Sequence, residues 1–378
     1  MTISEDIAAL APKLGERGDD IAAARRLPAD VVSAMRAAGA FRIAAPRALG
    51  GPEMTPREQT EVIEVLSRHE ASVGWCAMIG SDAPYYGSFL EPEAAAELWT
   101  SIDDITAGQV PPNGQARPVD GGYLVSGRWA FGSGCTHADV IVGGCMVMDG
   151  DAPSFASGRP DFVVACAPAS SWTVLDTWHT TGLAGSGSND YTVTDLFVPE
   201  RHTFRFTDPV QRPEPLYGWP GMFFINMAGV ALGLARRAID EAIAIVAEKV
   251  LVPEMVPLRD TSRARLAIAR AEAEYGAARA YVYDSLDRFW AEVVAGDTPS
   301  IDVRVAVGLS RAHSFHVARD IAQAMSDLIG ASSIYRNHPV ERLVRDSITM
   351  SQHIAAQERM FEMLGQLQLT GTSTMPLI

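Results

Sequence analysis

Hydrophobic spacing divides the chain into three regions. Through residues 1–104, apolar positions recur at helical intervals, as in "ISEDIAALAPKL" and "TEVIEVLSRHE". From 105 to 211 the pattern changes to short β-branched runs such as "DVIVGGCMVM" and "YTVTDLFVP", with turn residues between them. Long amphipathic, alanine-rich stretches fill 212–378. The pattern predicts an α+β protein: an N-terminal helical domain, a middle antiparallel β-sheet or small barrel of roughly six to eight strands, and a C-terminal four-helix bundle.

A sheet between two helical regions creates crevices where the layers meet, and such crevices are the usual place for a sizeable ligand. The net charge is −15, from 46 acidic and 31 basic residues. This balance disfavours nucleic acid and an anionic membrane surface as partners.

Neither secretion nor membrane insertion is indicated. The segment "MTISEDIAALAPKL" lacks the basic-then-apolar order of a signal peptide, and no uncharged apolar run approaches the ~18 residues of a membrane span. The four cysteines, Cys76, Cys135, Cys145 and Cys166, form no C-x-x-C pair. The sequence therefore favours a reduced, cytoplasmic protein.

A first candidate for chemistry is "GRWAFGSGCTHAD", residues 127–139. Ser133 lies between Gly132 and Gly134, and paired glycines allow a backbone to approach a flat ligand closely. The serine hydroxyl can donate to, or accept from, a ring nitrogen or carbonyl. The alternative is an ordinary glycine-rich turn beside one partly buried tryptophan, Trp129.

A second candidate is the loop "GLAGSGSND", which contains Gly185, Gly187 and Ser188. Its successive N–H groups can form an anion-binding nest. The spacing lacks the third glycine of a dinucleotide fingerprint, and a strand rather than a helix follows. A plain β-turn is the alternative.

The third candidate is the region around residues 327–353. One helix is expected to end at Gly330, a short loop carries Ser332 and Ser333, and a new helix starts near Pro339. Hydroxyls and helix-terminal amides in such a loop suit a phosphate or pyrophosphate.

The new helix is expected to carry a polar stripe with His353 at its centre. Continuous helical spacing would place on one face the residues Arg345, Thr349, Gln352, His353 and Gln357. The imidazole either lines a pocket as a catalytic group or makes a structural contact between helices.

Two other site classes find no support. His313 and His316 are spaced for a shared metal, but no cysteine or carboxylate set completes the ligands, so we predict no metal site. The G-x-S-x-G elbow of a serine hydrolase does not occur.

These stretches, together with "ASVGWCAMIGS" near the N-terminus, resemble the acyl-CoA dehydrogenase fold in their order and spacing. More closely they resemble its flavin-dependent monooxygenase branch, the oxygenase components of two-component systems. The resemblance covers nearly the whole chain. It implies reduced flavin (FADH2 or FMNH2) and O2, and hydroxylation of an electron-rich aromatic substrate, phenol- or indole-like, through a C4a-hydroperoxyflavin.

The resemblance also implies residue roles, with His353 and Ser133 on opposite walls of one flavin cavity. His353 would be the base, and Ser133 would reach the N5/O4 side of the ring. Cofactor contacts would come from Trp129, Ser133, Gly185, Gly187 and Ser188, and phosphate contacts from Arg263, Ser332 and Ser333. The substrate pocket would be lined by Trp75, Asp82, Tyr85 and Tyr86.

Two departures from that branch are visible. Relatives acting on phenols often carry a histidine some nine residues after the "GW" pair, whereas this chain reads "GWCAMIGSDAPYY". Many relatives also have arginine where this chain has Ala184, which weakens a charged contact to the flavin tail.

Partners and alternatives follow from the same features. No NAD(P)H fingerprint occurs, so a separate NAD(P)H:flavin reductase is expected, and the family implies a homotetramer. A true acyl-CoA dehydrogenase would need a placed glutamate base, and the region "MSQHIAAQERM" offers a histidine instead. An N-oxygenase of an amino sugar, and a ligand-binding protein that lost the chemistry, are the further alternatives.

Overall fold

The computed structural model describes residues 2–156 and 158–373. The N-terminal helices are α1 (Ile3–Glu16), α2 (Gly18–Ala24), α3 (Ala29–Ala37), α4 (Pro56–His69), α5 (Ala71–Gly80), α6 (Ala83–Gly87) and α7 (Pro92–Leu98). Capping boxes start two of them: Thr2 with Glu5 at α1, and Thr55 with Glu58 at α4. These reciprocal bonds satisfy amides that the first helical turn leaves unpaired.

The middle region forms a mixed eight-stranded sheet. Its strands are β1 (Thr106–Val119), β2 (Gly122–Gly132), β3 (Val140–Asp149), β4 (Ala152–Pro153), β7 (Phe162–Pro168), β8 (Thr173–Val174), β9 (Asn189–Pro199) and β10 (Thr203–Phe204). The order is β10-β7-β3-β1-β2-β9-β8, with β4 paired to β3. A separate small ribbon joins β5 (Phe155–Ala156) to β6 (Arg159–Pro160).

One strand pair corrects the expectation of an antiparallel sheet. β1 and β3 run parallel, pairing Thr106 with Val140 and Gly114 with Cys145. The connection 133–139 takes the chain from β2, on one side of β1, to β3 on the other, so β3 runs in the direction of β1. Hydrophobic alternation is the same for either pairing, and the sequence pattern therefore could not distinguish them.

The C-terminal region is a helical bundle. Its helices are α8 (Ala228–Glu248), α9 (Ser262–Val294), α10 (Ile301–Ile329), α11 (Pro339–Met350) and α12 (Glu358–Thr370). The short hairpin β11 (Val250–Leu251) and β12 (Val256–Pro257) joins α8 to α9. The expected fourth helix is two helices, α11 and α12, with turns at 351–357 between them.

His353 therefore lies in an interruption of the helix, and the expected stripe on one helix face is wrong beyond Met350. Side-chain bonds stabilise the interruption. His316 of α10 donates from Nε2 to the carbonyl of Ala356 (2.8 Å), and the Ala355 N–H donates to Nδ1 of His353 (3.2 Å). These bonds satisfy main-chain groups that a continuous helix would pair internally.

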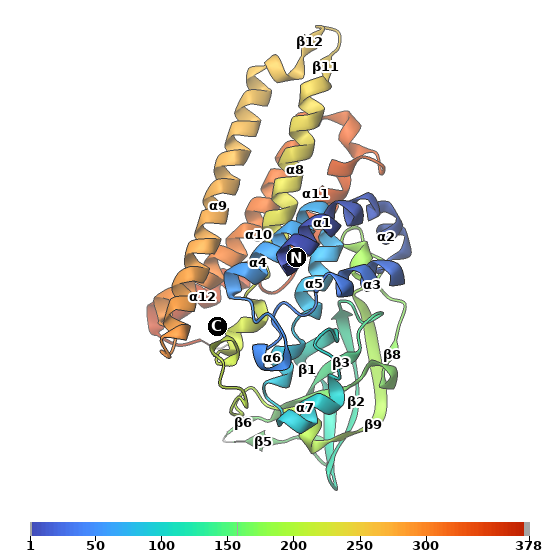
Figure 1. Cartoon of the computed structure of the whole chain (residues 1–378), viewed down its shortest axis with the longest axis vertical. Coiled ribbons are helices and arrows are strands. Elements are labelled where there is room, and N and C mark those ends of the chain that lie inside the picture. The colour runs from blue at the N-terminus through green and yellow to red at the C-terminus, as the bar shows by residue number, and fades with distance from the viewer. Residues whose placement is uncertain (1, 157, 374–378) are drawn as a thin grey trace.

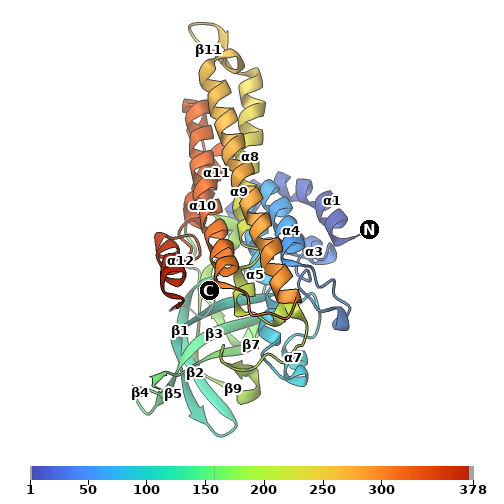
Figure 2. The ribbon, with the colours of Figure 1, turned by 90° about the vertical axis from the view of Figure 1, so that its left-hand side faces the viewer.

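The long helices α8, α9 and α10 rise at one end of the molecule, the N-terminal helices lie in the middle, and the sheet forms the other end (Figures 1 and 2). α5 lies where these layers meet, in contact with α4, α8, β1 and the turn η3 (Ala184–Ser186). Among the described residues, the span Pro220–Glu248 is long and apolar enough for a membrane helix, but 83% of its apolar window is buried, as in a core helix.

Candidate active site

Trp75 is the centre of the candidate site. It comes from the middle of α5 and is 6% exposed. Its indole Nε1 donates to Oγ of Ser133 (2.9 Å), which begins the connection that crosses from β2 to β3. Helix α5 is thereby joined to the sheet crossover at the point where the helical layer meets the sheet.

Ser133 continues into a chain of hydroxyl groups. Ser133 Oγ lies 2.8 Å from Ser188 Oγ, which lies 2.7 Å from Ser186 Oγ. Ser186 donates to the carbonyl of Leu183 (2.7 Å). Because Trp75 can only donate and Leu183 O can only accept, each hydroxyl must donate to the next one along the chain, in the direction from Trp75 to Leu183.

His353 approaches Trp75 from the bundle side. The two rings meet edge to face with centroids 5.6 Å apart, and Phe224 contacts the imidazole at 6.0 Å. Thus Ser133 and His353 both contact Trp75, one at its N–H and the other at its ring. The fold brings the two predicted residues together, but an indole stands between them.

The tautomer and the protonation state of His353 are set by its surroundings. Nδ1 accepts from Ala355 N–H, so in the neutral ring the proton lies on Nε2. Burial, and then the positive charge of Arg311, lower the pKa of His353 to about 4. The imidazole is therefore neutral near pH 7, with Nε2–H as the group left for a ligand.

The imidazole of His353 should not titrate near neutral pH. The Cε1–H resonance of His353, assigned by its loss in His353→Gln, should stay fixed from about pH 5 to pH 8, while histidine in a reference peptide titrates near 6.5. Proton NMR of the folded chain measures this. A midpoint near that of the peptide would mean that the ring is freely solvated.

Helix α11 holds the loop that carries the hydroxyl chain. The carboxylate of Asp346 accepts from Leu183 N–H (2.6 Å), and Asp346 and nearby Glu70 are both buried. Burial, and the negative charge of Glu70, raise the pKa of Asp346 to about 7. Burial likewise raises the pKa of Glu70, although Arg342 lies 3.6 Å from it.

Stability should therefore depend on this carboxyl. The pKa of Asp346 is about 7 in the folded chain and near 3.8 in the unfolded chain, so the folded chain holds this proton more tightly. Protonation of Asp346 therefore stabilises the folded chain at low pH, and this stabilisation is lost as the pH rises through about 7. Between about pH 5 and pH 7, Asp346→Asn should flatten the decline in free energy of unfolding, by up to ~1.4 kcal/mol per pH unit. Urea unfolding tests this, with Asp320→Asn as the exposed control; equal slopes in all three proteins would contradict it.

The residues around the hydroxyl chain fit a flavin ring. Thr136 Oγ1 is buried without a hydrogen-bond partner among the described residues, and a Cβ built on Gly187 would lie 3.3 Å from it. Close by in sequence, Phe131 is 63% exposed and meets Trp178 edge-on at 6.3 Å. The hydroxyls suit the polar edge of the ring, and the exposed aromatic pair suits its flat face.

Of two further predicted cofactor contacts, Trp129 lies away from the hydroxyl chain and Gly185 lies beside it. Trp129 is fully buried in the sheet core, stacked on Tyr191 at 5.5 Å, and its Nε1 donates to Gly144 O (2.8 Å). At Gly185 a Cβ would come within 2.2 Å of Ile21, so this glycine allows the loop to pack against α2. The structure does not bring Trp129 to the cluster of Trp75, Ser133 and His353. Gly185 lies directly before Ser186 of the hydroxyl chain and close to Ser72 of α5, and its cofactor role stays a prediction.

The predicted phosphate ligands form a separate group at the end of α10. Arg263 donates to the carbonyls of Asp327 and Leu328, and Lys249 lies 3.3 Å from Ser332 Oγ. Ser333 is buried against the same helix end. Helix α11, of 12 residues and thus ~18 Å long, lies between this group and the segment carrying His353. The phosphate role stays a prediction.

The predicted substrate residues on α6 face a second aromatic cluster. Tyr85 bonds Gln59 through its hydroxyl, and Tyr86 packs on Phe223 at 4.7 Å. Asp82 is buried, and burial raises its pKa well above the ordinary value. Phe223 faces this cluster, and its neighbour Phe224 faces His353, so η6 (Pro220–Phe224) lies between the two groups.

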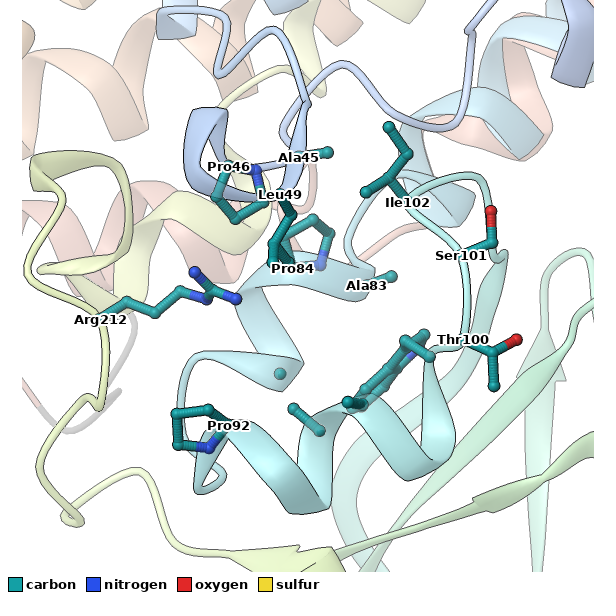
Figure 3. A pocket seen from close by; sticks show the side chains of 14 residues that line it. Ala45, Pro46, Leu49, Ala83, Pro84, Pro92, Thr100, Ser101, Ile102 and Arg212 are labelled. Carbon is teal, nitrogen blue, oxygen red and sulfur yellow. The ribbon is translucent and has the colours of Figure 1, made fainter.

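A cleft of about 330 Å³ opens on the outer side of α6 (Figure 3). Ala83 and Pro84 line it, and Arg212 reaches toward it from the opposite loop. None of Trp75, Ser133 and His353 is among its lining residues. It is therefore distinct from the candidate site.

Several residues of the site escaped the sequence reasoning, among them Phe131, Thr136, Ser186, Phe224 and Arg311. Arg311 of α10 is 5% exposed, with its guanidinium over the ring of Phe224 at 5.3 Å. A signal was present, because a single arginine interrupts the buried face of α10 between Val307 and Phe315. Among residues 2–156 and 158–373 no cluster of three or more metal-binding side chains occurs.

Comparison with known proteins identifies similar chains. Residues 8–87 match the acyl-CoA dehydrogenase N-terminal domain, and residues 225–358 match the acyl-CoA dehydrogenase C-terminal domain. The indole-3-acetate monooxygenase of Pseudomonas putida is 34% identical over 87% of this chain and 84% of its own length. The oxygenase component of the FADH2-dependent resorcinol hydroxylase of Rhizobium sp. is 29% identical over 92% and 88%.

The fold has a close structural counterpart. The crystal structure of 3-HSA hydroxylase from Rhodococcus sp. RHA1 superposes with a TM-score of 0.90 at 26% identity, covering 100% of this chain and 99% of that one. Similarity thus extends over all three layers of the molecule.

Proposed function

Because this chain belongs to the flavin-dependent monooxygenases of the acyl-CoA dehydrogenase family, we propose that it hydroxylates an electron-rich aromatic compound, phenol- or indole-like. The observation that carries the proposal is the convergence of the Ser133 hydroxyl and the His353 imidazole on Trp75. One side of the indole offers hydroxyls for the cofactor. The other offers an imidazole and a phenyl ring for an aromatic substrate.

Reduced flavin, once bound, would supply the two electrons that activate O2, so that one oxygen atom of O2 enters the substrate and the other leaves as water. In this proposal Ser133 and Ser188 bind the polar edge of the flavin, and Phe131 takes the ring contact first expected of Trp129. Trp75 and Phe224 hold the aromatic ring of the substrate and exclude water, which protects a reactive site from side reactions.

His353 is proposed to handle the proton of the substrate hydroxyl or ring nitrogen. Because Nε2 already carries a hydrogen, the ring would take the substrate proton at Nδ1 and give up its 3.2 Å contact with the Ala355 N–H. Removing the proton raises the electron density of the aromatic ring of the substrate. Because the pKa of His353 is lowered to about 4, the ring would pass the proton on rather than hold it.

The reduced flavin would come from a separate NAD(P)H:flavin reductase, as expected of an oxygenase component. The four cysteines are buried free thiols, which supports a cytoplasmic location. Exposed apolar side chains gather near the α8–α9 hairpin and the end of α10, at Val252, Met255, Ile334 and Tyr335. We propose that a second copy covers them in a homotetramer; light scattering giving only monomer would rule this out.

The proposed activity is tested with the purified chain, a flavin reductase, FAD or FMN, NADH and ¹⁸O2. We expect one labelled oxygen atom in a product from a phenol or an indole, and none when the reductase is left out. Oxidation of a CoA thioester without reductase, or peroxide as the sole product with every aromatic tried, would reject the proposal.

A further inference from the structure

Arg311 carries a charge that nothing in the described chain balances. Its Nη1 donates to the carbonyl of Phe224 (3.3 Å), and its Nε, though buried, has no hydrogen-bond partner. Within residues 2–156 and 158–373 no carboxylate lies within ion-pair distance of it. Burial alone lowers the pKa of Arg311 to about 10, so it stays charged at neutral pH.

Several other partly buried arginines of the fold face carboxylates. Arg205 pairs with Asp161 at 2.7 Å, and Arg342 lies 3.6 Å from Glu70. A buried positive charge without a partner destabilises the fold unless an anion binds beside it when the ligand is present. Since Arg311 is 5% exposed within a single chain, the missing anion must be small enough to enter the site.

The position of Arg311 indicates which ligand carries that anion. The contacts run in order from Ser188 through Ser133, Trp75, His353 and Phe224 to Arg311. Arg311 thus lies at the end remote from the hydroxyls assigned to the flavin edge, and it shares Phe224 with His353.

Resting on the proposed function, we infer that Arg311 binds the carboxylate of the substrate, which makes the substrate class an aromatic acid. The aromatic ring would lie against Trp75 and Phe224 beside His353, with its acid group at the guanidinium. A planar guanidinium matches a carboxylate through two parallel N–H···O bonds, which also fixes the orientation of the ring.

The test compares two ligands of nearly equal shape, indole-3-acetate and the neutral indole-3-acetamide. Titration calorimetry on the flavin-free chain, repeated anaerobically with reduced flavin, should show at least about tenfold tighter binding of the acetate. Arg311→Met should abolish this preference and leave the amide affinity within about threefold. Arg311→Lys should keep part of the preference, because lysine keeps the positive charge but cannot donate two parallel N–H···O bonds to a carboxylate.

Arg319→Met, two turns further along α10 at a half-exposed position, is the matched control and should keep the preference. Because Arg311→Met removes an unbalanced charge, its melting temperature without ligand should equal or exceed that of the parent chain, so misfolding cannot explain a loss. Equal affinity of the parent chain for both ligands, or an acetate preference retained in Arg311→Met, would overturn the inference.

A separate titration distinguishes the other anion source. If Arg311→Met weakened reduced-flavin binding and left the acetate preference unchanged, the guanidinium would serve the cofactor, and the inference would fail. Tight binding of the acetate that depends on Arg311, without any hydroxylated product from it or another aromatic acid, would instead reject the proposed function and leave the carboxylate site in place.

Discussion

Replacing His353 by alanine should lower the rate of hydroxylation by about 10²- to 10⁴-fold, the range for loss of a positioned proton-transfer group. The expectation rests on its place between Trp75 and Phe224 and on its neutral, Nε2-protonated ring. Reduced flavin should bind within about threefold of the parent affinity, because the hydroxyls assigned to it lie beyond Trp75. Oxygen consumption should continue as peroxide release, measured beside labelled product.

Two further variants separate chemistry from packing. Gln352→Ala alters an exposed neighbour in the same turn segment and should leave turnover unchanged. His353→Gln keeps an N–H donor without a basic nitrogen, so recovered activity would indicate a hydrogen-bonding role and no recovery would indicate proton acceptance. Unchanged turnover in His353→Ala would return the residue to a structural role.

The second large effect concerns stability and Trp129. Trp129→Ala should lower the free energy of unfolding by about 4 kcal/mol, because it empties a fully buried site and leaves the carbonyl of Gly144 unpaired. Gly114 and Gly127 make room for this indole, since a Cβ on either would come within 2.7 Å of it. Because these glycines have no side chains that could move into the space left by the indole, the cavity should persist.

Phe131→Ala is the matched comparison. Phe131 is 63% exposed, so its loss should change unfolding by under about 1 kcal/mol while weakening reduced-flavin binding severalfold. Trp129→Ala should instead lower the stability strongly and leave the flavin affinity of the folded molecules unchanged, measured below the melting temperature of the variant. If Trp129→Ala lost flavin binding without losing stability, the first expectation for that residue would be restored.

The layer order was predictable because hydrophobic periodicity can be read from a single sequence. The family was predictable from the order and spacing of stretches such as "ASVGWCAMIGS" and "GRWAFGSGCTHAD", which resemble it. Strand direction was not, since the crossover at 133–139 leaves no trace in the alternation of β1 and β3. The family and fold are confirmed, whereas the residue roles and the divisions after 104 and 211 stay predictions.

The site itself was partly predictable. The "GW" pair and the glycine-flanked serine indicated Trp75 and Ser133, which the structure joins by a hydrogen bond. The end of α11 was hidden, because no glycine or proline marks it and the bond that stabilises it comes from His316, 40 residues away. The sequence motif suggested Trp129 as a cofactor contact. Its burial was not predictable, because the space for its indole is left by glycines on three different strands, including Gly143.

The turn segment that carries His353 has a consequence for changing what the protein accepts. Its imidazole is oriented by local bonds to Ala355 and by one tether to Ala356 rather than by the register of a continuous helix. Substitutions or one-residue length changes within 351–357 can therefore redirect the ring while the flanking helices keep their packing. Libraries aimed at new aromatic compounds would gain most from diversity there, and least from the long helices on either side.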